Sequence, residues 1–255
     1  MSKSGESSNI PRRAFHGYMI NGVAVGITAA SRSPSARCDE PAIARDDESA
    51  TEAVNNSTST GDRELQQLID GNQRFVSGKL KHPHLGNHWR KRLSSGQKPF
   101  ATILGCSDSR VPPELLFDQG FGDLFVIRIA GNVVDTDVTG SVEYGVDHLS
   151  TRLVVVMGHD GCGAVTAALS SKSDLAKEPK AIRSLVGRIQ PAISQVDEAQ
   201  KFSTRLKQSV EANVRASVRQ LTSVPDLQKA IAANKTKIIG CVYDIKTGQV
   251  RTLDV

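Results

Sequence analysis

The apolar stretch FATILG at residues 100–105 leads directly into the polar segment CSDSR at residues 106–110. The same arrangement recurs farther along the chain, where LVVVMG at residues 153–158 leads into HDGCG at residues 159–163. Both apolar runs are short, partly β-branched and ended by glycine, which is typical of strands buried in a parallel sheet. The sequence therefore predicts an α/β fold, in which a central, mostly parallel β-sheet is flanked by helices.

Two candidate metal ligands, Cys106 and His159, directly follow these two runs, and a third, Cys162, lies three residues beyond His159. In open α/β sheets, functional side chains gather beyond the carboxyl ends of the strands, where helix N-termini also point. Two thiolates and one imidazole suit Zn²⁺, and a zinc ion with only three protein ligands keeps one position open for water or substrate. We therefore expect the three residues to meet and to hold one catalytic zinc ion per chain.

A carboxylate with its own basic partner, Asp108 with Arg110, lies two residues beyond the first candidate ligand. If the Asp108 carboxylate lay too close to the metal, it could itself bind zinc and displace the water. Arg110 can pair with it through two hydrogen bonds and leave an oxygen free to accept a hydrogen bond from the nucleophile. We predict that Asp108 orients the nucleophile and that Arg110 orients Asp108; the alternative is a plain structural ion pair.

The combination of CSDSR with GHDGCG resembles the β-class carbonic anhydrases, and the likeness extends over roughly residues 62–255. It implies reversible hydration of CO2 to bicarbonate and a proton. At matching positions it implies that Cys106, His159 and Cys162 bind zinc and that Asp108 and Arg110 form the catalytic pair. It also implies a homodimer or a larger even-numbered homo-oligomer.

The resemblance further suggests two substrate-binding residues, Gln119 and Tyr144. Gln119 lies about one place out of line with a glutamine that the plant-type members place near the metal. Tyr144 matches a position that lines the CO2 pocket in some members; the alternative is an ordinary core tyrosine. One subtype has a regulatory bicarbonate site that uses a tryptophan where this chain has Ile103, so we do not expect that site here.

Other functions fit parts of this pattern. A hydrolase of carbonyl sulfide or carbon disulfide would use the same nucleophile on another linear electrophile. A non-catalytic binding protein stabilised by zinc would need the ligands but not Asp108 and Arg110. In an oxidising compartment, Cys106 and Cys162 could instead form a structural disulfide, but that would leave His159 without a role.

Charge and composition limit the partners. The formal net charge is +5, but aromatic residues make up only 4% of the chain and do not alternate with basic ones. This composition gives no reason to expect nucleic-acid binding.

The first 36 residues resemble a twin-arginine export signal. Arg12 and Arg13 precede an apolar stretch at residues 18–30. That stretch is too short for an ordinary transmembrane helix, so we expect no stable membrane insertion. The prediction is an exported, periplasmic protein; the alternative is a cytoplasmic protein in which the arginine pair is accidental.

Two further segments complete the organisation. Residues 37–61 are rich in small polar and acidic side chains, which predicts a disordered linker. Residues 62–255 form the predicted catalytic domain. That domain begins with Leu65, Leu68 and Ile69 at helical spacing, which predicts an amphipathic helix. In the β-class family, a similar helix packs against a neighbouring subunit.

Overall fold

The structure is a computed structural model, and it describes residues 59–254. The predicted export signal at residues 1–36 lies outside the described residues. The predicted linker at residues 37–61 also lies outside them, except for its last three residues. The predicted periplasmic location therefore stays a prediction. Within the described residues, no helix is long and apolar enough to cross a membrane.

The predicted α/β fold is confirmed. Five strands form one sheet in the order β2-β1-β3-β4-β5. β1 pairs in parallel with both β2 and β3, and β3 pairs in parallel with β4, whereas β5 runs antiparallel to β4. The strands are β1 (Ala101–Gly105), β2 (Leu124–Arg128), β3 (Leu153–His159), β4 (Lys237–Tyr243) and β5 (Val250–Leu253).

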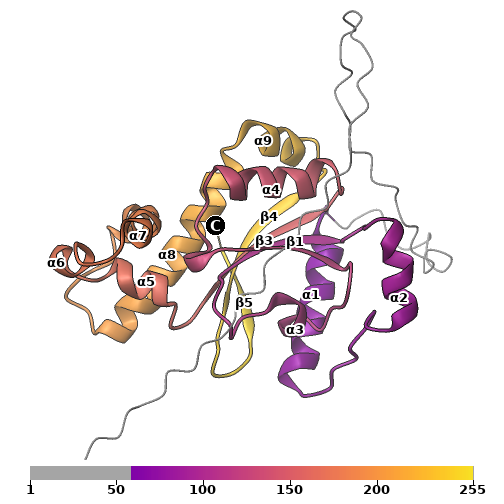
Figure 1. Cartoon of the computed structure of the whole chain (residues 1–255), viewed down its shortest axis with the longest axis horizontal. Helices are drawn as coiled ribbons and strands as arrows, with labels where there is room; N and C mark the ends of the chain where they lie inside the picture. Colours follow the sequence, from indigo (N-terminus) through magenta and orange to yellow (C-terminus); the bar gives the residue numbers. More distant parts are fainter. Residues whose placement is uncertain (1–58, 255) are drawn as a thin grey trace, which may run out of the picture. The chain divides into compact units, whose positions relative to one another are not determined.

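Helices connect the four parallel strands and cover both faces of the sheet, whereas a hairpin joins β4 to β5 (Figure 1). Every residue of β1 and β3 is buried, as expected of parallel strands that are covered on both faces. The helices are α1 (Asp62–Val76), α2 (Asn87–Arg92), α3 (Pro113–Leu116), α4 (Thr136–Asp147), α5 (Gly163–Ala168), α6 (Lys172–Leu175), α7 (Lys180–Ile193), α8 (Phe202–Thr222) and α9 (Pro225–Ala232), with short 3-10 turns η1 (Leu93–Ser95) and η2 (Ala130–Asn132).

Helix α8 packs directly against the centre of the sheet. An added Cβ at Gly158 of β3 would lie 2.6 Å from Val214 of α8, so glycine is required for this close approach. On β3, Val155 instead lines a groove shared with α1. Because successive residues of a strand point to opposite faces, these contacts place α8 and α1 on opposite sides of the sheet.

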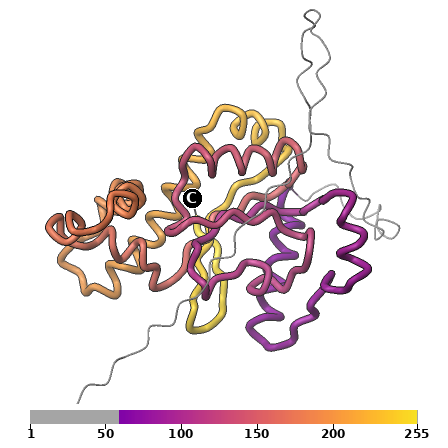
Figure 2. Tube along the Cα trace, viewed as in Figure 1, coloured from indigo at the N-terminus to yellow at the C-terminus, as the bar shows by residue number. Residues whose placement is uncertain are grey.

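Helix α1 is the predicted amphipathic helix. It lies at the start of the described chain and is hydrogen-bonded to the hairpin of β4 and β5, near the end of the chain. Its Asn72 side chain donates hydrogen bonds to the carbonyls of Leu116 (3.0 Å) and Gly248 (2.9 Å) and accepts one from the Val250 backbone N–H (2.9 Å). Figure 2 shows the indigo helix beside the yellow β4–β5 hairpin. These hydrogen bonds satisfy a buried amide that would otherwise destabilise the fold.

Candidate metal centre

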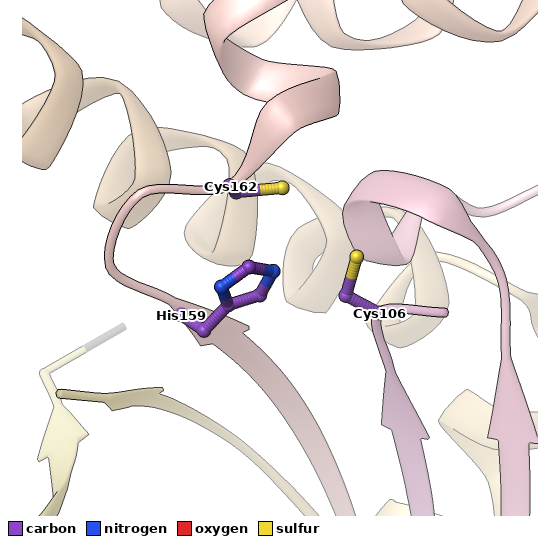
Figure 3. A group of neighbouring side chains, drawn as sticks. All are labelled: Cys106, His159 and Cys162. Carbon is purple, nitrogen blue, oxygen red and sulfur yellow. The ribbon is translucent and has the colours of Figure 1, made fainter. Parts of the chain in front are cut away.

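The sheet register explains how Cys106, His159 and Cys162 meet. β1 and β3 are neighbours, with Gly105 opposite Met157, so their carboxyl ends lie side by side. Cys106 directly follows β1, His159 is the last residue of β3, and Cys162 precedes the first turn of α5. The three side chains are buried, and their ligand atoms all lie within 4.8 Å of one another (Figure 3).

The two thiols of this centre influence each other's ionisation. A hydrogen bond from Cys162 is the main reason that the pKa of Cys106 falls to about 4, and the Gly131 N–H lowers it further. The same hydrogen bond, together with burial, raises the pKa of Cys162 above its usual range. The two sulfurs therefore ionise as a pair: the first proton is lost easily, because the remaining S–H stabilises the thiolate, and the second is held tightly.

One imidazole nitrogen of His159 is hydrogen-bonded, and the other is available to bind a metal. Its Nδ1 lies 3.0 Å from the Asp160 carbonyl oxygen, so Nδ1 carries the hydrogen and donates it. Its Nε2 is buried and has no hydrogen-bond partner in the described part of the chain. A buried Nε2 with a free lone pair beside two thiols fits a metal ligand, and the Nδ1 hydrogen bond sets the tautomer that a ligand requires.

Asp108 lies at the rim of this centre and is held by Arg110. The Arg110 Nε and Nη2 donate to the two carboxylate oxygens over 2.9 and 2.6 Å, and the Arg110 backbone N–H adds a third bond of 3.0 Å. The Arg110 guanidinium holds the pKa of Asp108 well below its usual range. Asp108 Oδ2 is 3.9 Å from His159 Nε2, so an ionised carboxylate lies beside the imidazole of this group.

Arg128, the last residue of β2, clamps the segment that carries both Cys106 and Asp108. Its Nε donates to the Cys106 carbonyl (2.9 Å) and its Nη2 to the Asp108 carbonyl (2.6 Å). The register makes this possible, because Arg128 lies opposite Gly105 on the neighbouring strand. Sequence analysis did not predict this function, although an arginine at the end of a strand next to the CSDSR strand is a signal that could have suggested it.

In the described part of the chain, no hydrogen bond or ring contact joins the two predicted substrate-binding residues to this centre. The Gln119 amide donates to the Phe117 carbonyl (2.7 Å) and accepts from Gln67 (3.3 Å). The ring of Tyr144 packs near Phe125 and His148, with centroid distances of 6.0 and 4.9 Å. None of these contacts includes a candidate ligand, so substrate binding by Gln119 and Tyr144 stays a prediction.

A buried Cys-His-Cys group beside an ionised carboxylate, at the carboxyl edge of an α/β sheet, is an arrangement typical of metal-dependent enzymes. Comparison with known proteins narrows this class. A family model described as carbonic anhydrase matches residues 101–250. Carbonic anhydrase 2 of Mycobacterium tuberculosis is 40% identical over 190 residues, which cover 71% of this chain and 87% of that protein. The carbonic anhydrase of Mycolicibacterium smegmatis is also 40% identical, over 183 residues that cover 72% of this chain and 88% of that protein.

Solved structures agree with the sequence comparisons. A β-carbonic anhydrase of Sordaria macrospora, one of two described as tetrameric, is 26% identical with a TM-score of 0.62; the match covers 76% of this chain and 98% of that one. A Coccomyxa β-carbonic anhydrase in complex with acetazolamide is 26% identical with a TM-score of 0.60, over 77% of this chain and 87% of that one. The chain therefore belongs to the carbonic anhydrase family, in its β class, and is an enzyme of that family.

Proposed function

We propose that this enzyme catalyses the zinc-dependent, reversible hydration of CO2 to bicarbonate and a proton. The observation that carries the proposal is the convergence of Cys106, His159 and Cys162 within 4.8 Å, with the Asp108 carboxylate beside the imidazole at the rim. Membership of the carbonic anhydrase family supports CO2 as the substrate.

Cys106, His159 and Cys162 would hold one zinc ion per chain. Two sulfurs and one imidazole nitrogen are a donor set that zinc prefers, and three protein ligands leave a position open for catalysis. The buried, unpartnered Nε2 of His159 supports this assignment. When bound there, zinc supplies a nucleophile at neutral pH, because it lowers the pKa of a coordinated water to about 7.

Asp108 and Arg110 would prepare this centre for the reaction. The low pKa of Asp108 keeps its carboxylate ionised at neutral pH, so it acts as a hydrogen-bond acceptor and orients the attacking group toward CO2. Arg110 occupies both carboxylate oxygens from the outer side. This pairing restrains Asp108 from rotating inward to become a fourth ligand, which would close the open position.

The two alternative functions have less support. A non-catalytic zinc protein needs no ion-paired carboxylate beside its ligands, and the chain belongs to a family of enzymes. Hydrolysis of carbonyl sulfide or carbon disulfide would need the same centre, and the relatives compared above are carbonic anhydrases.

The first test is stopped-flow CO2 hydration on the purified full chain, with metal content measured on the same sample. We expect about one zinc ion per chain, turnover that a chelator removes and added zinc restores, and a circular dichroism spectrum that the chelator leaves largely unchanged. Zinc without CO2 hydration at neutral and alkaline pH would contradict the proposal; turnover of carbonyl sulfide or carbon disulfide would then favour the hydrolase. Unfolding on metal removal would favour the structural role.

We also propose that the enzyme forms an even-numbered homo-oligomer. The β-carbonic anhydrases of Sordaria macrospora are described as tetrameric. The β4–β5 side of the sheet carries an open groove next to α1, which is consistent with burial in an assembly; its apolar lining includes Leu65, Ile69, Val76, Ile239 and Val250. Light scattering of the full chain should give an even multiple of the chain mass, and a monomer at micromolar concentration would contradict this proposal.

A further inference from the structure

Helix α8 presents a row of polar side chains to the loop that contains η2, and two of them, Asn213 and Ser217, are buried. Asn213 donates to the Gly131 carbonyl (2.8 Å), Ser217 to the Asn132 carbonyl (3.2 Å) and Gln220 to the Val134 carbonyl (3.3 Å). These residues are spaced four and three apart, so they lie on one face of the helix. The row fixes a loop whose backbone groups would otherwise have no partner from a regular element.

Gly131 connects this row to the metal centre. Its N–H donates to Cys106 Sγ over 3.3 Å, and its carbonyl accepts from Asn213. Its φ of +70° is a conformation that glycine adopts without strain. An added Cβ would lie 2.7 Å from Ile189 and 3.0 Å from Ala164, so the loop packs too closely for a larger residue.

The two hydrogen bonds of Gly131 depend on each other. Glycine has wide conformational freedom, and the N–H can point at the sulfur only while the residue keeps this one conformation. Asn213 is only 2% exposed, so water cannot readily replace its amide as the partner of the carbonyl. Outer hydrogen-bond partners of this kind orient metal ligands and tune their basicity.

We propose that Asn213 is a positioning residue for the metal centre, which acts by holding Gly131 so that its N–H is fixed on Cys106 Sγ. This inference rests on the proposed function, because it assumes that Cys106 is a metal ligand. In the described structure no hydrogen bond joins Asn213 to the candidate ligands or to Asp108; its effect passes through Gly131.

The test compares Asn213→Ala with Ser217→Ala in the full chain. Both variants remove one buried hydrogen bond from the same face of α8 to the same loop, but only Asn213 holds Gly131. In the Co²⁺-substituted protein, the thiolate-to-cobalt charge-transfer bands should shift in Asn213→Ala and stay unchanged in Ser217→Ala. Metal release to a chelator should be about 10-fold faster in Asn213→Ala, as for other outer-shell partners, and within about twofold of the parent in Ser217→Ala.

A second readout does not require metal. In the metal-free protein, hydrogen–deuterium exchange of the peptide containing Gly131 should speed up in Asn213→Ala and not in Ser217→Ala. If Asn213→Ala does not fold, Asn213→Ser serves instead, because its shorter side chain removes the same hydrogen bond with a smaller loss of packing. Equal effects of the two substitutions on the bands and on exchange, or no effect of the Asn213 substitution, would overturn the inference.

Failure of the proposed function would look different. In that case the parent protein would bind no metal or would not hydrate CO2, while exchange at Gly131 would still report whether Asn213 holds the loop.

Discussion

Replacing Cys162 with serine is expected to remove the metal and CO2 hydration together. A serine hydroxyl stays protonated at neutral pH and is a much poorer zinc ligand than a thiolate. The donor set then contains only Cys106 and His159, too few to retain zinc against dilution. Turnover should fall by more than the roughly 100-fold that loss of an outer hydrogen-bond partner costs. The measurements are zinc content after gel filtration and stopped-flow hydration.

Cys241→Ser is the matched control for this experiment. Cys241 is also a buried free cysteine, on β4, and burial raises its pKa to about 12. It does not belong to the group formed by Cys106, His159 and Cys162. The control should keep its zinc and its turnover, and can lose about 1–3 kcal/mol of stability from burying a hydroxyl. If Cys162→Ser kept both zinc and turnover, Cys162 would not be a ligand.

Replacing Asp108 with asparagine is expected to abolish most turnover while the zinc content stays unchanged. The amide has nearly the same shape as the carboxylate, but it carries no charge and loses the bidentate ion pair with Arg110. The asparagine can also turn its NH2 group toward the metal centre, where the proposed role requires a hydrogen-bond acceptor. We expect kcat to fall by about 10²- to 10⁴-fold, the range for groups that manage a proton in the transition state.

Asp174→Asn provides the control for Asp108. Asp174 also forms a carboxylate ion pair, with Lys177 at 2.8 Å, but on the exposed surface of α6. This control should leave kcat, KM and zinc content unchanged, since exposed pairs contribute little. If Asp108→Asn lost zinc and turnover in equal proportion, Asp108 would support the metal site structurally, and its predicted role as an orienting group would be wrong.

Most of the fold and the centre of the site could be predicted from local sequence. The apolar runs before Cys106 and His159 predicted two buried parallel strands, and the structure has β1 and β3 there. The general rule for α/β sheets then placed the polar residues at one edge. Leu65, Leu68 and Ile69 predicted α1 through their spacing alone. Each of these inferences depends on the spacing of apolar residues or on which residues follow one another along the chain. Both can be read directly from the sequence.

Which residues support the metal centre from outside became clear only from the tertiary structure. Asn213 and Gly131 are 82 positions apart, and no periodicity distinguishes Asn213 from an ordinary polar residue on an amphipathic helix. Gln119 and Tyr144 match a family position, or nearly so; the structure places them against Phe117 and His148, and their substrate binding stays a prediction.

The sequence by itself thus determined two central strands, β1 and β3, the candidate ligands and the Asp108–Arg110 pair, because their chemistry lies within short segments. Tertiary structure decided the strand register, the Arg128 clamp and the support of Gly131 by α8. The physical reason is that hydrogen bonds between distant elements depend on how those elements pack, and packing is a property of the whole core.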